Sequence, residues 1–100
     1  MQTPEQRIQN KIIKELKTLQ DKGYPIFFEK RQAGGFTYKK GLADLYIVIN
    51  GKHIEVEVKA EDGEPSPMQI TKKEKFNKLY KIDYLIVKSW NEVYDYIKSL

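Results

Sequence analysis

The sequence predicts one α/β domain over residues 1–100, in which a mixed sheet surrounds a central antiparallel hairpin. The first indication is a helical spacing of apolar residues near the N-terminus. The second is a nearly continuous apolar run, 42–50, joined by Asn50-Gly51 to a run of alternating residues, 52–60. The third is a further helix, strand and helix after residue 66. The predicted order is α-β-β-β-α-β-α.

The first helix has a clear start and a clear end in the sequence. Thr3 suits the cap, Pro4 the first helical position, and Gln6 completes a capping box. Gly23 is expected to end the helix. The apolar stripe of this helix comprises Ile8, Ile12, Leu16 and Leu19.

Three strands are predicted next. Residues 24–30 form the first, and the unbroken apolar run 42–50 is typical of a strand covered on both faces. Asn50-Gly51 is the strongest short hairpin signal, so 52–60 is the returning strand.

The C-terminal part is predicted as helix, strand, helix. Ser66-Pro67 opens a helix to about Lys81, a strand covers 83–89, and Asn91 caps the last helix. The residues expected to face inward are Met68, Phe76, Leu79, Tyr80, Val93, Ile97 and Leu100.

The hairpin register gathers charged residues at one end of the sheet. A two-residue turn puts Asp44 opposite Glu57, with Lys59 next along the strand. Opposed like charges destabilise a sheet by roughly 0.2–1 kcal/mol, and a bound divalent cation would offset that cost. A three-residue loop would instead shift the register by one and scatter the group.

Mg²⁺ is held by one or two carboxylates, waters and a phosphate, and such waters can attack that phosphate. Lys59 would then ease hydroxide formation or neutralise the developing charge. The alternative is a solvated ladder of Glu–Lys pairs. That alternative accounts for Glu55 but not for Asp44, which begins an apolar strand.

Two further polar residues project onto apolar helix faces. Glu5 is either a first-turn residue favouring the helix dipole or an acid that reaches the metal, directly or through water. Gln69 either bonds to backbone at its helix start or orients Lys59, the attacking water or a phosphate. The single histidine, His53, is expected at the surface.

The composition narrows the function classes. Lys and Arg number 18 against 14 Asp and Glu, so the net charge is +4 and the pI about 9.2, which favours a polyanionic partner. The absence of cysteine excludes disulfides, thiol nucleophiles and cysteine-ligated metals, and fits an intracellular protein. No stretch is apolar enough to span a membrane, and nothing points to an organic cofactor.

Basic and aromatic residues near the acidic cluster are the predicted DNA-binding surface. The loop 31–41 has three glycines and three basic residues, and it precedes Asp44 directly. The predicted contacts are Lys30, Arg31, Tyr38, Lys39, Lys40, Lys72 and Lys73.

Asp44 and Glu57-Val58-Lys59 together resemble the signature of the PD-(D/E)xK nuclease superfamily, with Ala43 in the place of the motif's proline. Within it, the chain looks like a stand-alone virus-type replication–repair nuclease (VRR-NUC) domain of the phage and bacterial type. The stretches that carry this likeness are EQRIQNKIIKEL (5–16), GLADLYIV (41–48), IEVEVKAEDGEPSPMQ (54–69) and YLIVKSWNEVYDYI (84–97).

The resemblance implies a restriction-endonuclease-like core and a DNA endonuclease. Asp44, Glu57 and the backbone carbonyl of Val58 would hold Mg²⁺ or Mn²⁺, and Lys59 would assist the attacking water. Glu5 and Gln69 match the family's further polar positions.

Small stand-alone members resemble Holliday-junction resolvases and act as homodimers, so branched DNA is the expected substrate. The alternatives are a nuclease for flaps, single strands or nicked duplex, a non-cleaving DNA-binding module, and a subunit that needs a partner chain.

Overall fold

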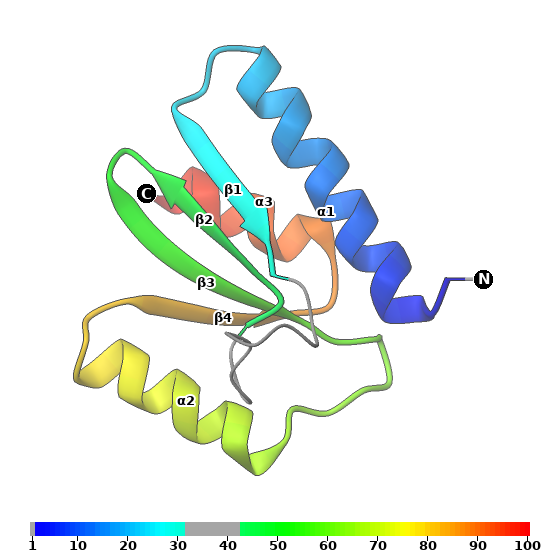
Figure 1. The fold of residues 1–100 in the computed structure, drawn as a ribbon, viewed down its shortest axis with the longest axis vertical. Helices are drawn as coiled ribbons and strands as arrows, with labels where there is room; N and C mark the ends of the chain where they lie inside the picture. The colour runs from blue at the N-terminus through cyan, green and yellow to red at the C-terminus, as the bar shows by residue number, and fades with distance from the viewer. Residues whose placement is uncertain (1, 32–42) are drawn as a thin grey trace.

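Figure 1 shows the computed structural model, which describes residues 2–31 and 43–100. The described elements follow the predicted order α-β-β-β-α-β-α. They are α1 (Pro4–Asp21), β1 (Ile26–Lys30), β2 (Leu45–Ile49), β3 (Lys52–Val58), α2 (Pro67–Lys78), β4 (Asp83–Val87) and α3 (Trp90–Ser99). The small α/β fold with a mixed sheet is therefore confirmed. No helix in the described part of the chain is long and apolar enough to cross a membrane.

Local sequence signals account for the two ends of α1. Thr3 accepts a hydrogen bond from the backbone N–H of Gln6, and the Gln6 side chain accepts one from the backbone of Thr3. Two of the free N–H groups of the first turn are thereby satisfied. Gly23 follows the helix with φ +96°, a conformation that glycine adopts without steric cost.

The sheet has the strand order β1-β2-β3-β4. Its first three strands are antiparallel, and β4 runs parallel to β3. Asn50 and Gly51 both have positive φ, 52° and 78°, as a tight two-residue hairpin turn requires. Ile49 consequently pairs with Lys52, which is the register that the sequence predicts.

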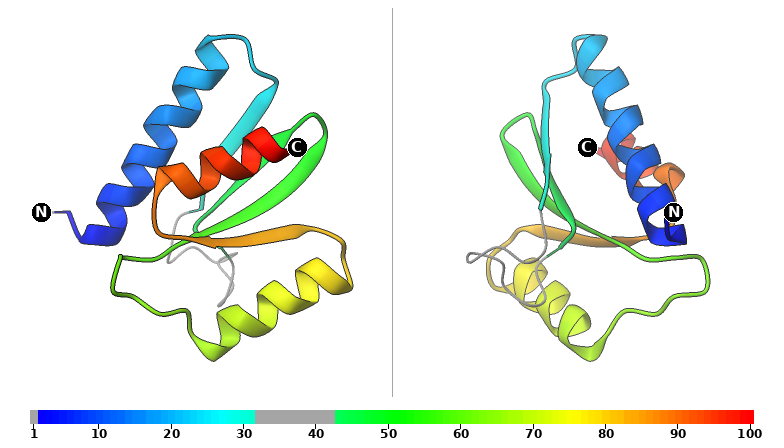
Figure 2. Two further views of the ribbon diagram at one scale, coloured as in Figure 1. Left: turned by 180° about the vertical axis from the view of Figure 1, so that it is seen from behind. Right: turned by 45° about the vertical axis from the view of Figure 1, so that its right-hand side comes forward.

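The helices cover the two faces of the sheet unequally. α1 and α3 lie together on one face, and α2 lies on the other (Figures 1 and 2). The core lies between the sheet and the α1–α3 pair, because buried residues of both helices and of the strands form one cluster. Along β2, buried residues alternate with half-buried ones. The buried members of the core are Ile12, Leu16, Leu19, Ile26, Leu45, Ile47, Ile49, Ile54, Val56, Val58, Val87, Val93 and Ile97.

Several details of the C-terminal half differ from the prediction. α2 ends at Lys78 rather than Lys81 and has no buried residue. Phe76 does pack against the sheet, 5.5 Å from the ring of Tyr84. Val93 and Ile97 are buried as predicted, whereas four of the predicted inward residues are exposed, namely Met68, Leu79, Tyr80 and Leu100. Ser89, not Asn91, caps α3, because its hydroxyl accepts from the backbone N–H of Glu92.

Candidate active site

The acidic cluster lies where β3 ends and β2 begins. Leu45 pairs with Val56, so Asp44, one residue before β2, lies beside the end of β3. The backbone N–H of Val58 donates to Asp44 Oδ2 at 2.8 Å. The hairpin thus brings Asp44 and Glu57 together, as its turn predicts.

Glu57 is buried, with 5% of its surface exposed. Its Oε2 accepts a hydrogen bond from Gln69 Nε2 at 2.8 Å, and Lys59 Nζ lies 3.9 Å from the same oxygen. Its other oxygen, Oε1, is buried and has no hydrogen-bond partner within the described part of the chain. A buried carboxylate oxygen without a partner is costly, so a further cation or proton is required there.

Burial raises the cost of ionising both carboxylates, and the charge of Asp44 adds to that cost for Glu57. Burial, and then the charge of Asp44, raise the pKa of Glu57 from 4.5 to about 7. Burial also raises the pKa of Asp44, while the N–H of Val58 opposes that shift. The charge of Glu5 acts in the same upward direction on the pKa of both groups. Glu5, on the first turn of α1, is therefore close enough to the acidic cluster to affect the ionisation of both carboxylates.

The donor set fits a hard divalent cation. Carboxylate and carbonyl oxygens are the ligands that Mg²⁺ and Mn²⁺ accept, and Mg²⁺ usually takes only one or two carboxylates. Within residues 2–31 and 43–100, no group of three or more His, Cys, Asp or Glu side chains is placed to hold a metal. The carbonyl of Val58 and water would then complete the coordination, with Glu5 acting through water.

Gln69 makes the backbone contact considered for it, and it also makes a contact with Glu57 that the sequence did not predict. Its Oε1 accepts from the backbone N–H of Ser66, which closes the capping box of α2. Its Nε2 donates to Glu57, so the same amide links the start of α2 to the acidic cluster. Gln69 therefore fixes one oxygen of Glu57 and leaves the other directed elsewhere.

The interpretation of Glu55 as a surface residue is wrong, since only 2% of it is exposed. The guanidinium of Arg31 donates to both carboxylate oxygens of Glu55, to Oε1 through Nη1 and to Oε2 through Nη2 at 2.9 Å. His53 Nε2 contacts the same Oε2. Burial would raise the pKa of Glu55, but the hydrogen bonds from Arg31 and His53 outweigh it and lower that pKa.

Arg31 also secures the start of the strand that carries Asp44. Its backbone N–H donates to the carbonyl of Asp44 at 2.8 Å, and Nη1 donates to the carbonyl of Ala43 at 3.1 Å. Sequence reasoning missed this role. No signal in the sequence alone indicates it, because residue 31 shares a face with Glu55 only through the pairing of Glu29 with Tyr46, which the structure supplies.

The side chain of His53, predicted at the surface, is only partly exposed to solvent. Its ring stacks on Tyr46 with centroids 5.1 Å apart, and its Nε2 contacts Glu55. It is the second partner of a buried glutamate rather than an isolated surface histidine.

The predicted DNA contacts are spread over three places. Lys30 is exposed at the end of β1, next to Arg31. On α2, Lys72 is half-buried and Lys73 Nζ donates to the carbonyl of Tyr84 at 2.8 Å. The remaining predicted contacts lie outside the described residues, namely Tyr38, Lys39 and Lys40.

Comparison with known proteins agrees with this geometry. One solved structure, described as a VRR_NUC domain, superposes with a TM-score of 0.74 and 25% sequence identity, and the match covers 97% of each chain. The likeness supports a VRR-NUC domain. No protein-family model and no curated protein sequence matches the chain. The VRR-NUC likeness places the domain among nuclease-type folds, with DNA as the suggested substrate.

Proposed function

We propose that this VRR-NUC domain is a Mg²⁺- or Mn²⁺-dependent endonuclease that hydrolyses phosphodiester bonds in branched DNA. The observation that supports it most is that Glu57 Oε1 is buried and has no hydrogen-bond partner within residues 2–31 and 43–100. Among the residues that the structure describes, the cation paired with Glu57 is Lys59, whose ammonium lies 3.9 Å from Oε2, the opposite oxygen. A divalent cation at this point would neutralise both carboxylates.

The bound cation would polarise the scissile phosphate and supply an activated water. Asp44 and Glu57 would hold the cation, and the N–H of Val58, which donates to Asp44 Oδ2, fixes the orientation of the Asp44 carboxylate. Gln69 holds Glu57 in a single rotamer by donating to Oε2. Lys59, partly buried beside the pair, presents an ammonium that stabilises the charge developing on the phosphate oxygens.

Branched DNA, such as a four-way junction, is the proposed substrate, and a homodimer the proposed form. Two active sites related by a twofold axis can nick two strands of a symmetric junction. The second candidate is cleavage of flaps, single strands or nicked duplex. A DNA-binding module without cleavage is less compatible with the acidic pair, because an acidic pair repels phosphate unless it holds a cation.

A cleavage assay tests the proposal. A labelled four-way junction, a flap, a single strand and a plain duplex are each incubated with Mg²⁺, Mn²⁺ or EDTA. Lys59→Ala serves as the inactive variant, and Lys78→Ala, an exposed change of the same charge, as the control. We expect paired symmetric nicks in the junction that EDTA and Lys59→Ala abolish. Binding without cutting under every condition would overturn the nuclease assignment.

A further inference from the structure

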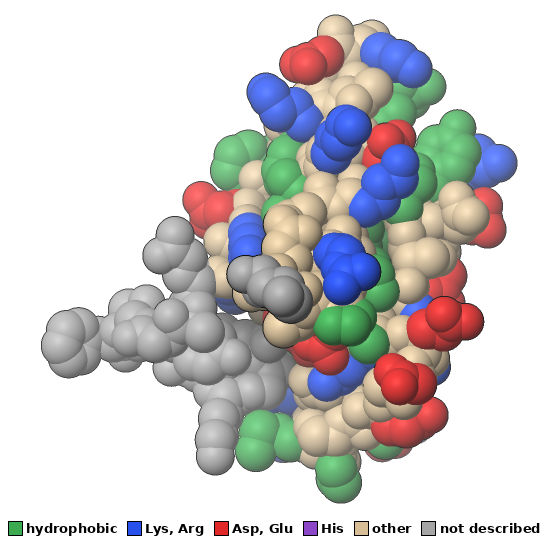
Figure 3. Space-filling view, turned by 90° about the vertical axis from the view of Figure 1, so that its right-hand side faces the viewer, with side chains coloured by type: hydrophobic (Ala, Val, Ile, Leu, Met, Phe, Trp, Pro, Cys, Tyr) green, Lys and Arg blue, Asp and Glu red, His purple; other side chains and the backbone are tan. Residues whose placement is uncertain are grey.

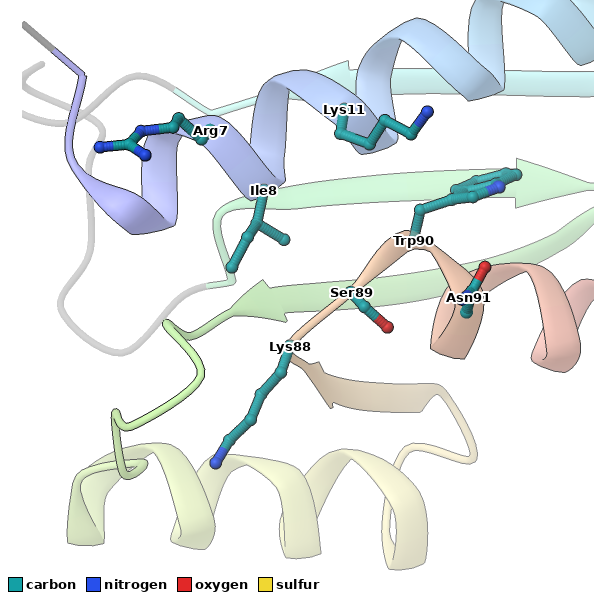
Figure 4. Close-up of a pocket in the computed structure, with 7 residues that line it drawn as sticks. All are labelled: Arg7, Ile8, Lys11, Lys88, Ser89, Trp90 and Asn91. Atoms are coloured by element: carbon teal, nitrogen blue, oxygen red, sulfur yellow. The ribbon is translucent and has the colours of Figure 1, made fainter.

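A pocket of about 330 Å³ opens between the first half of α1 and the start of α3. Figure 4 shows Ile8 and Trp90 facing the space between the two helices, with Arg7 and Lys11 above it on α1 and Lys88 and Ser89 below it. This volume is at the lower end of the ~300–1,000 Å³ range of small-ligand pockets.

Trp90 gives the pocket a flat aromatic wall. Its ring stacks on Tyr94, with centroids 5.6 Å apart and planes 30° apart. Both Trp90 and Ile8 are only partly buried and pack against the core, which fixes them in place. A supported and partly exposed indole is the kind of surface on which a nucleobase stacks.

The rim of the pocket is cationic. Arg7 has no hydrogen bond or ion pair from its side chain to any other described residue. Lys11 Nζ makes an exposed ion pair with Glu15 at 3.2 Å, a kind of contact that is easily exchanged. Lys88 contributes its methylene stem, since its Nζ donates to the carbonyl of Glu61 at 3.0 Å. Arg7 and Lys11 are therefore the two side chains available for an anion.

The pocket begins at the same edge of the sheet as the acidic cluster. Lys88 follows Val87, whose carbonyl accepts from the backbone N–H of Lys59 at 2.9 Å. Arg7 lies two residues after Glu5, which influences Asp44 and Glu57. A DNA strand that extends from the acidic cluster along α1 would therefore reach the pocket next.

Basic side chains continue from the pocket along α1. Arg7, Lys11 and Lys14 recur at helical spacing and are all exposed. In Figure 3, Lys and Arg side chains gather over the part of the molecule that faces the viewer, where α1 runs. A stripe of this kind follows a phosphate backbone and favours DNA over an uncharged occupant.

We propose that this pocket binds one unpaired nucleotide of the DNA substrate. The base stacks on Trp90 and Ile8, and the adjoining phosphate contacts Arg7 and Lys11. The inference rests on the proposed nuclease function and refines it: the preferred substrate carries an unpaired nucleotide close to the scissile bond, as at a flap, a bulge or an opened branch point.

Tryptophan fluorescence reports directly on this pocket, because Trp90 is the only tryptophan of the sequence. The intact protein in EDTA is titrated with a short blunt duplex, the same duplex with a single-nucleotide bulge, the same duplex with a flap, and a deoxynucleoside monophosphate. We expect the bulged and flapped DNA to quench Trp90 emission and to bind more tightly than the blunt duplex. Stacking of one base corresponds to roughly a 5- to 100-fold gain in affinity.

Variants separate the pocket from general electrostatics. Arg7→Ala with Lys11→Ala should remove most of the preference for bulged DNA and lower the salt dependence of binding by roughly one to two phosphate contacts. Trp90→Phe keeps an aromatic wall and should retain the preference, whereas Trp90→Leu should lose it. Lys75→Ala with Lys78→Ala, both exposed on α2 across the sheet from α1, is the charge-matched control and should leave the preference unchanged.

The outcomes separate this inference from the proposed function. Metal-dependent cutting with equal quenching by blunt and bulged duplex would overturn the pocket and leave the nuclease standing. Quenching confined to unpaired nucleotides, without cutting under any condition, would support the pocket and remove the nuclease. Equal losses in the Lys75, Lys78 double variant and in the Arg7, Lys11 double variant would also overturn the pocket, because the effect would then be one of net charge.

Discussion

Removal of the Arg31 side chain should destabilise this domain more than any other single change of a charged residue outside the acidic cluster. Glu55 is 2% exposed and is neutralised mainly by the two hydrogen bonds from Arg31. Arg31→Ala leaves that carboxylate buried with His53 as its remaining partner. The variant also frees the carbonyl of Ala43, which accepts from Arg31 at 3.1 Å.

The expected loss of unfolding free energy in Arg31→Ala follows from these contacts. Loss of one partner of a buried ion pair costs about 3–5 kcal/mol, because an uncompensated charge remains. The Arg31 side chain is 23% exposed and His53 persists, so a value of about 3 kcal/mol is expected. For a domain of this length, that corresponds to a fall in melting temperature of roughly 10–20 °C.

Urea unfolding of the metal-free protein measures this loss. Lys30→Ala, a neighbouring exposed change, is the control and should stay within about 0.5 kcal/mol of wild type. Arg31→Met combined with Glu55→Gln should recover most of the stability, since no unpaired charge is left. An Arg31→Ala variant within about 1 kcal/mol of wild type would refute the reasoning. So would a double variant that is less stable than Arg31→Ala.

Three further predictions concern the acidic cluster and the loop before it. Asp44→Asn should leave the metal-free domain as stable or more stable, since like-charge repulsion falls and an amide oxygen can still accept from Val58. It should also abolish the rise in melting temperature with Mg²⁺ or Mn²⁺, and equal rises in wild type and variant would argue against Asp44 as a ligand. Glu57 has a pKa raised from 4.5 to about 7, so its contribution to metal-free stability is full below about pH 4.5 and is lost as the pH rises through 7. The loss is at most about 3 kcal/mol, and urea unfolding from about pH 5 to pH 8 should show a decline that Glu57→Gln flattens. Lys39→Ala with Lys40→Ala should weaken DNA binding and flatten its dependence on salt, and an unchanged slope would remove these lysines from the binding surface.

The hairpin was predictable because its determinants are local. Asn50-Gly51 favours positive φ at both positions, and the alternation of the returning strand permits one register only. The position of Asp44 beside Glu57 then follows by counting along the two strands. The inward direction of the Gln69 side chain was also predictable from the sequence. Its direction and its place in the capping box both follow from the spacing of residues along the helix.

The partner of Glu55 was not predictable in this way, because it depends on a non-local pairing. Arg31 meets Glu55 only because Lys30 pairs with Leu45, across a loop whose length fixes no register. The DNA-binding prediction for Arg31 came from its place in a basic, glycine-rich loop beside the predicted metal site, where its side chain was taken to be free for phosphate. The exposure of Leu79, at 68%, was not predictable for a similar reason. Helical spacing predicts which residues form an apolar stripe, but not which part of the protein packs against that stripe.

The two buried glutamates of β3 differ in one respect that bears on function. Glu55 and Glu57 point to the same face two residues apart, and both are nearly inaccessible to solvent. For Glu55 the chain provides charge compensation through Arg31 and His53, and its pKa is lowered. For Glu57 it provides a neutral amide, an ammonium at 3.9 Å and a second carboxylate, and the pKa is raised.

A protein that can neutralise a buried carboxylate at position 55 has the means to do so at position 57. Its failure to do so costs stability in the metal-free state once Glu57 is ionised, and above about pH 7 a bound cation would recover that cost. The deficit of positive charge at Glu57 is therefore better explained as a binding determinant than as a packing defect. On this argument, Mg²⁺ or Mn²⁺ should raise the stability of wild type by more at pH 8 than at pH 6, since the ligands must be deprotonated to bind. Glu55→Gln, which leaves the acidic pair intact, should keep that metal response even though its fold is weakened.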